Sequence, residues 1–119
     1  MRRHAVLVLV LAVGLVSSCS ITRAGAWLQA QDAFAAGDYR GAIKKADASL
    51  RYGSPSEEER ANANLLKAQS YERLGQIGDA VALYTFVARN FPQTPQGYQA
   101  AFALARIAPN QATKGEHAF

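Results

Sequence analysis

Cys19 is the only cysteine of the chain, and it follows an apolar run and two serines. A lone thiol in this position could be a core residue, a nucleophile, half of an intermolecular disulfide or an attachment point. A disulfide within the chain needs a second cysteine, and a nucleophilic thiol needs a neighbouring base. The only histidines are His4, before the apolar run, and His117, near the C-terminus. The residue types therefore favour attachment over catalysis for Cys19.

The sequence lacks the other residue combinations that support catalysis or metal binding. It has no glycine-rich phosphate loop, no pair of closely spaced cysteines, no zinc-protease motif and no complete Ser-His-Asp set. The run Glu57–Glu59 is typical of a solvated helix N-terminus, and Lys44–Lys45 is typical of an exposed helix face. We therefore predict no enzyme activity, no cofactor, no metal and no small-molecule substrate.

The charge of the chain does not indicate a nucleic-acid partner. The formal net charge is +4. Arg2 and Arg3 precede the apolar run, so removal of that segment would lower the positive excess further. A basic excess this weak and this scattered is not the footprint of nucleic-acid binding.

The first residues have the three-part layout of a signal peptide: basic, apolar, then small. The basic part is Met1–His4, the apolar part is Ala5–Val16, and Ser17 and Ser18 are the small residues. An apolar helix of this length spans roughly 18 Å, short of the ~30 Å hydrocarbon core of a bilayer. A cleaved signal peptide is therefore favoured over a stable transmembrane span.

The four residues Val16-Ser17-Ser18-Cys19 resemble the lipobox of bacterial lipoproteins, a family that prefers Leu at the first position and Ala or Gly at the third. The resemblance implies a signal peptide over residues 1–18, a lipid on Cys19 and a lipidated N-terminus and tether over residues 19–25. Two or three acyl chains anchor a protein stably, because each buried CH₂ adds ~0.8 kcal/mol. A free thiol after an ordinary signal peptide and an uncleaved signal anchor are the alternatives.

Ser20 bears on which membrane the lipid would enter. In bacterial sorting an Asp at this position resembles an inner-membrane retention signal, and this chain has Ser there. We therefore expect anchoring in the outer membrane, on its periplasmic face, with anchoring in the inner membrane as the alternative.

Two stretches of the mature chain share one pattern of small residues. Aligning Ala30–Ser49 with Ala68–Val87 places Gly37 over Gly75 and Ala42 over Ala80. The pattern resembles a tetratricopeptide repeat, in which a glycine marks the turn and a small residue the helix crossing. The matching residues are Ala30, Gly37, Tyr39 and Ala42 in the first stretch, and Ala68, Tyr71, Gly75, Ala80, Tyr84 and Pro92 in the second.

The resemblance implies an all-α fold, a short solenoid of antiparallel helix pairs over residues 26–107, with about two repeats plus a capping helix. A generic alanine-rich helical bundle is the alternative. Local signals place the helices at about 22–36, 39–52, 55–74, 77–91 and 95–107. We expect residues 108–119 to be a disordered tail.

Two local features sharpen this prediction. Ser54-Pro55-Ser56-Glu57 indicates a capping box at the start of the third helix. In the fifth helix the apolar residues fall on one face, and we expect the helix to cover the apolar face of the second repeat as a solvating cap. The residues of that face are Tyr98, Ala101, Phe102 and Ala105.

In the family that these residues resemble, the first helix of each pair lines a concave face that binds a peptide. By repeat position, the resemblance implies partner-binding residues at Trp27, Gln31, Phe34, Asn62, Leu65, Gln69, Glu72 and Arg73. Trp27 lies one position past the tryptophan of the family pattern. It is either a peptide anchor or a cap for the N-terminal end of the solenoid, and we favour the cap.

The resemblances together imply a lipid-anchored, non-enzymatic adaptor of the bacterial cell envelope, which binds a protein or peptide segment in outer-membrane or envelope assembly. The stretch FVARNFPQTPQGYQAAFALA is similar to segments of envelope repeat lipoproteins. The alternative is a pilotin-like factor that delivers a secretin or pilus component to the outer membrane.

Overall fold

The structure is a computed structural model that describes residues 24–116, with side chains described as far as Pro109. The predicted signal peptide over residues 1–18 and the predicted lipid attachment site Cys19 lie outside the described residues, as do residues 117–119. Signal cleavage and lipidation therefore stay predictions.

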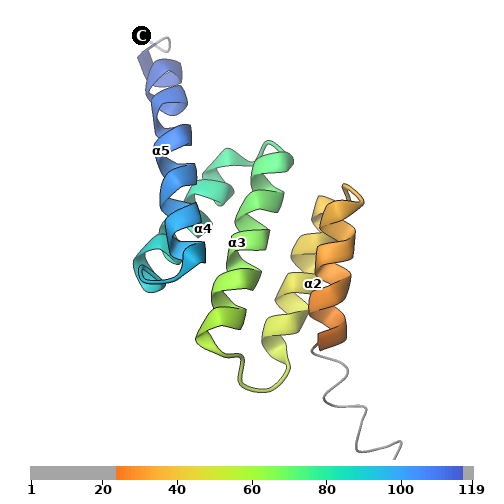
Figure 1. The fold of residues 1–119 in the computed structure, drawn as a ribbon. Coiled ribbons are helices and arrows are strands. Elements are labelled where there is room, and N and C mark those ends of the chain that lie inside the picture. The colour runs from red at the N-terminus through yellow and green to blue at the C-terminus, as the bar shows by residue number, and fades with distance from the viewer. Residues whose placement is uncertain (1–23, 117–119) are drawn as a thin grey trace, which may run out of the picture.

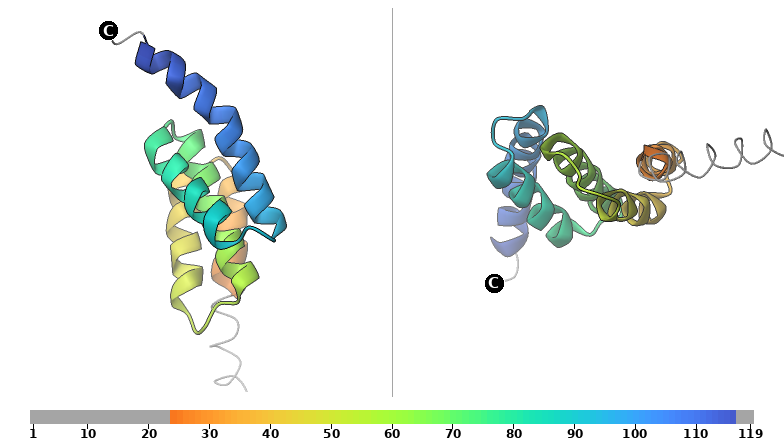
Figure 2. Two further views of the ribbon diagram at one scale, coloured as in Figure 1. Left: turned by 90° about the vertical axis from the view of Figure 1, so that its left-hand side faces the viewer. Right: turned by 90° about the horizontal axis from the view of Figure 1, so that it is seen from below.

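The described part of the chain forms helices and no strand. The first helix covers residues 24–35 and is followed by α2 (Tyr39–Arg51), α3 (Glu57–Arg73), α4 (Ile77–Asn90) and α5 (Pro95–Glu116). Consecutive helices run antiparallel and pack side by side, and α3 also contacts α5 (Figure 1). Seen from below in the right-hand view of Figure 2, the first helix, α3 and α5 form one layer, and α2 and α4 form the other. This arrangement confirms the predicted all-α solenoid.

The turns inside the two helix pairs have the same geometry. Gly37 and Gly75 both have positive φ, 80° and 76°, a region that glycine enters without steric cost. In each turn two backbone hydrogen bonds of 2.9 to 3.0 Å close the preceding helix. They join Gly37 to Phe34 and Asp38 to Ala33 in the first turn, and Gly75 to Glu72 and Gln76 to Tyr71 in the second. At the turns, equivalent residues of the two aligned stretches therefore make the same backbone hydrogen bonds.

Alanines lie where the helices of each pair cross. Ala30 and Ala42 in the first pair, and Ala68 and Ala80 in the second, are all fully buried. A residue this small lets two helix axes approach closely, and it favours the helix intrinsically. The periodic small residues of the sequence are thus the contact points between helices, which distinguishes the fold from an unpatterned bundle.

The start of α3 differs from the expected one. The helix begins at Glu57 with Ser56 as its cap, so the predicted start at residue 55 is too early. The Ser56 hydroxyl accepts from the Glu59 backbone N–H at 3.1 Å, and the Ser56 N–H donates to Glu59 Oε2 at 2.6 Å. The spacing of a capping box occurs twice in this segment, from Ser54 and from Ser56, and the structure uses the second.

The packing face of α5 is also different from the expected one. Ala100, Ala103 and Ile107 are buried against the second helix pair. Gly97 helps to fix this orientation, because a Cβ there would lie 2.0 Å from the carbonyl oxygen of Phe91. The face that sequence analysis singled out points outward instead, and it consists of Tyr98, Ala101, Phe102 and Ala105. α5 does cover the second pair, but its outer face is apolar and not that of a solvating cap.

The end of α5 lies beyond the expected one. The helix contains Pro109 and continues to Glu116, so the prediction of a tail without regular structure from residue 108 is wrong for most of that segment. Proline removes one backbone donor from a helix, which weakens or kinks it. Here the loss of that donor does not end the helix.

Candidate partner-binding groove

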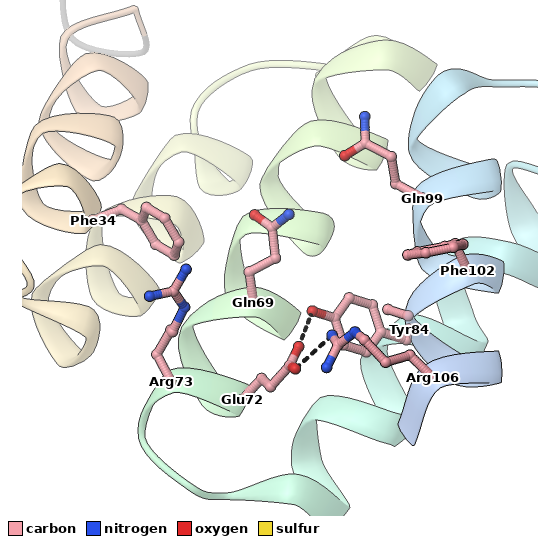
Figure 3. A pocket seen from close by; sticks show the side chains of 9 residues that line it. Phe34, Gln69, Glu72, Arg73, Tyr84, Gln99, Phe102 and Arg106 are labelled. Atoms are coloured by element: carbon pink, nitrogen blue, oxygen red, sulfur yellow. Dashed lines mark hydrogen bonds and ion pairs between the residues drawn. The ribbon is translucent and has the colours of Figure 1, made fainter. Parts of the chain in front are cut away.

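A groove of about 640 Å³ opens on the layer formed by the first helix, α3 and α5 (Figure 3). Its lining comes from four helices: the first helix and α4 contribute one residue each, and α3 and α5 contribute the rest. The residues are Phe34, Gln69, Glu72, Arg73, Tyr84, Gln99, Phe102, Ala103 and Arg106. The groove is open to solvent, so a segment of another molecule can reach its lining residues.

Helical spacing explains how α3 and α5 present their side chains to the groove. Glu72 and Arg73 follow Gln69 by three and four residues on α3, which places both of them beside Gln69 on one helix face. Gln99 and Arg106 are two turns apart on α5, also on one face. Because α3 and α5 lie in the same layer, these two faces form opposite sides of the groove (Figure 3).

Phe34 forms the wall on the side of the first helix. Its ring meets the ring of Tyr39 edge to face, with centroids 5.3 Å apart and an interplanar angle of 70°. Phe34 also packs against the core cluster of the first pair and is half-buried. Its position is therefore fixed by packing, while part of the ring stays accessible from the groove.

Glu72 is held by two partners from different helices. The Tyr84 hydroxyl donates to Glu72 Oε2 at 2.6 Å, and Arg106 Nη2 lies 2.5 Å from Glu72 Oε1 (Figure 3). Burial raises the pKa of Glu72. The hydrogen bonds from Tyr84 and Arg106, with the charges of Arg106 and Arg73, lower it by more, so the pKa lies below its ordinary value of 4.5.

The same contact changes the acidity of the Tyr84 hydroxyl. Burial, the hydrogen bond to Glu72 and the negative charge of Glu72 all raise the pKa of Tyr84 above its ordinary value of 10.0. At neutral pH the network therefore consists of a protonated tyrosine, an ionised carboxylate and a guanidinium. In this state Tyr84 is a fixed donor and not a general base.

Arg73 differs from the other charged groups of the groove. It is exposed at the last turn of α3, and it forms no hydrogen bond or ion pair with another described residue. The carboxylate of Glu72 is neutralised by Arg106. Within the described lining, the charge that is left over is therefore the positive charge of Arg73.

Four of the predicted partner-binding residues line the groove together: Phe34, Gln69, Glu72 and Arg73. Leu65 does not, because it is 7% exposed and belongs to the core of the second pair. Gln31 is exposed on the first helix but lies outside the lining. Partner binding by these residues stays a prediction.

The other two predicted residues make internal contacts. Asn62 Oδ1 accepts a hydrogen bond of 2.6 Å from Gln96 Nε2, so this amide joins α3 to α5. Trp27 is half-buried and packs with the cluster of the first pair, which includes Ala30 and Leu66. This contact favours the interpretation of Trp27 as a structural cap over that of a peptide anchor.

The groove has five further lining residues that were not predicted from the sequence: Tyr84, Gln99, Phe102, Ala103 and Arg106. A signal for three of them exists, since the repeat period of about 34 residues carries Leu65 onto Gln99, Gln69 onto Ala103 and Glu72 onto Arg106. The interpretation of the incomplete third unit as a cap leaves these positions out of the predicted site. No comparable signal points to Tyr84, whose hydroxyl reaches the groove from the core.

Within residues 24–109, no group of three or more His, Cys, Asp or Glu side chains could hold a metal ion. No helix in the described part of the chain combines the length and the hydropathy that a membrane span requires.

A family comparison agrees with the repeat geometry. The model of the tetratricopeptide repeat matches residues 28–84 and again residues 65–111. The chain belongs to the tetratricopeptide repeat family. Tetratricopeptide repeats generally mediate protein–protein interactions, and the fold is typically a non-enzymatic scaffold. No curated protein and no solved structure matches the chain.

Proposed function

We propose that the protein is a non-enzymatic adaptor of the bacterial cell envelope that binds a protein segment in the groove between the first helix, α3 and α5. The observation that supports this most directly is the groove itself. It combines an aromatic ring, the side-chain amides of Gln69 and Gln99, and the exposed guanidinium of Arg73. Its volume lies within the usual range for ligand sites. These groups suit a peptide, which offers both backbone amides and side chains.

The proposed location rests on the sequence around Cys19. The lipobox-like stretch supports lipid attachment at Cys19, on the periplasmic face of the outer membrane. The first helix begins at residue 24, and the segment from Cys19 to Arg23 reaches at most about 18 Å when fully extended. A lipidated Cys19 would therefore keep the groove close to the membrane surface, where envelope proteins are its available partners.

A crosslinking experiment in cells tests the adaptor function. A photo-reactive amino acid at Gln69 should capture a defined envelope protein, because this side chain points into the groove (Figure 3). The matched control is Ala82, which is exposed on α4 outside the lining. Capture of the same proteins from both positions, or of cytosolic proteins alone, would contradict the proposal. A secretin or pilus subunit as the captured protein would identify the pilotin-like form of the adaptor.

Replacement of Cys19 tests the anchor. Cys19→Ala should abolish labelling by fatty acids and leave an uncleaved precursor or a soluble protein, because alanine cannot carry the lipid. Labelling and membrane fractionation measure both results, and Ser20→Ala is the matched control. A Cys19→Ala protein that still incorporates fatty acid would show that the anchor is wrongly assigned.

A further inference from the structure

We infer that the segment bound in the groove is acidic and carries an apolar side chain next to its carboxylates. The inference rests on the proposed function, because it names the chemistry of the partner that the groove would hold.

The charges of the groove favour an acidic ligand. Glu72 is occupied on both oxygens, by the Tyr84 hydroxyl and by Arg106. Arg73 is exposed and forms no hydrogen bond or ion pair with another described residue, and the side chain of Arg106 is still 51% exposed. A carboxylate that enters the groove meets two guanidiniums and only one anion, which is already neutralised. A basic segment would have to displace Arg106 from Glu72 before it found a partner.

The aromatic rings favour an apolar side chain in the same segment. Phe102 is 73% exposed, the largest fraction among the described large hydrophobic residues. It faces the groove from α5, and Phe34 faces it from the first helix (Figure 3). Each ring leaves apolar surface in water, and an aliphatic or aromatic side chain of the bound segment that packed on it would remove that surface from water. A ligand with charge alone would leave Phe102 in water.

The amides favour a peptide over an isolated anion. Gln69 on α3 and Gln99 on α5 point into the groove on its two sides (Figure 3). Each carboxamide carries two donors and an acceptor, the set that matches the N–H and C=O of a peptide backbone. A lipid phosphate would use Arg73 but has no N–H donors for these acceptors. The groove thus suits an extended acidic peptide segment.

A display selection tests the inference on the full-length chain in detergent. A random dodecapeptide library is selected against the wild-type chain, Arg73→Glu and Arg89→Glu. Arg89 is the matched control, because it is also an exposed arginine in the last turn of a helix but lies outside the groove. We expect Asp and Glu beside a large apolar residue in the peptides selected by the wild-type chain and by Arg89→Glu. Arg73→Glu should lose this enrichment.

The consensus peptide then gives a measured change in affinity. Its affinity, followed by fluorescence anisotropy, should fall about tenfold in Arg73→Glu and in Phe102→Ala, the size expected for a loss near 1.4 kcal/mol. It should also weaken as salt rises, because the interacting charges are partly exposed. Circular dichroism checks that both exposed substitutions leave the helices intact.

The outcomes separate this inference from the proposed function. The inference fails if the wild-type chain selects no acidic peptides, or if Arg73→Glu and Arg89→Glu select the same peptides. It also fails if phosphatidylglycerol vesicles bind the wild-type chain in an Arg73-dependent manner while no peptide does. Peptides of another chemistry that still compete for the groove would overturn the acidic preference and leave the adaptor function standing. The adaptor function itself is decided by the crosslinks from Gln69.

Discussion

The two helix pairs follow the same backbone plan but differ at one crossing position. In the second pair Tyr84 fills this position and is 2% exposed, whereas Ala46 fills it in the first and is fully buried. Ala46 contributes only close packing. Tyr84 fills the core and also carries its hydroxyl to Glu72 in the groove. The comparison shows that a single larger residue connects the core of the second pair to the binding surface.

The difference extends to the rest of the two cores. The buried members of the first cluster are Ala30, Ala46, Ala63 and Leu66, with half-buried Trp27, Phe34 and Leu50 around them. The second cluster contains large buried residues, among them Tyr84, Val87, Phe91 and Ile107. Because stabilisation scales with the apolar surface removed from water, the second cluster, which joins the second pair to α5, carries more of the stability of the domain. The first pair contributes mainly a wall to the groove.

The largest expected effect comes from making the second pair resemble the first. Tyr84→Ala removes a buried ring and should destabilise the domain by about 3–5 kcal/mol, the usual cost of truncating a large core side chain. Urea unfolding followed by circular dichroism measures the loss. Leu28→Ala, at a position that is 58% exposed in the first helix, is the control and should change little. A loss below about 1 kcal/mol for Tyr84→Ala would show that the second core does not depend on this ring.

A smaller effect is expected where the two pairs are alike. Gly75→Val and Gly37→Val should each destabilise by about 1–3 kcal/mol, because a β-branched residue is strained at positive φ. Space is not limiting, since no atom lies within 4 Å of a Cβ built at either glycine. Gly75→Asn should cost less, because Asn tolerates the left-handed region. An unchanged melting temperature for both valine variants would contradict the assigned turns.

The smallest effect concerns the pH dependence that only the second pair should show. The pKa of Glu72 is lower in the folded chain than its ordinary value of 4.5. Its contribution to stability is therefore complete above that value and is lost as the pH falls through the lower pKa of the folded chain. Tyr84→Phe removes one of the hydrogen bonds that lower this pKa. It should cost about 1 kcal/mol near neutral pH and make the acid loss shallower.

The control in the first pair is the same chemical change at its tyrosine, Tyr39→Phe, which should leave the pH dependence unchanged. Tyr39 contacts Phe34 through its ring and makes no described hydrogen bond to a carboxylate. Urea unfolding between neutral pH and pH values below 4.5 compares the three proteins. Identical pH profiles for Tyr84→Phe and the wild type would show that Glu72 does not depend on the tyrosine.

The sequence was sufficient for features that depend on local chemistry. The turns at Gly37 and Gly75 follow from the glycines, and the crossings follow from the repeated alanines. These signals are local or periodic, so they can be recognised in the sequence without knowledge of the tertiary structure. Phe34, Gln69, Glu72 and Arg73 come together in the groove because one helical face of each unit turns to the same side.

Other features depend on how helices cross, and the sequence alone did not reveal them. α5 is apolar on two faces, so periodicity could not decide which face packs. The close approach of Gly97 to the Phe91 carbonyl is one of the contacts that fix the packed face. The pairing of Glu72 with Tyr84 and Arg106 joins three helices and has no local signature. The register of the α3 cap was ambiguous because Ser54 and Ser56 both have a Glu three residues later.

Phe102 has a consequence for the length of the array. The residues at the equivalent position of the first two units are Ala30 and Ala68, both fully buried beneath the second helix of their pair. A further helix that approached α5 at the same distance would collide with the ring of Phe102. A polar outer face commonly ends a solenoid, whereas the outer face of α5 carries the bulky, exposed Phe102. Phe102→Ala would restore the small residue found at this position in the first two units, against which a further helix could pack.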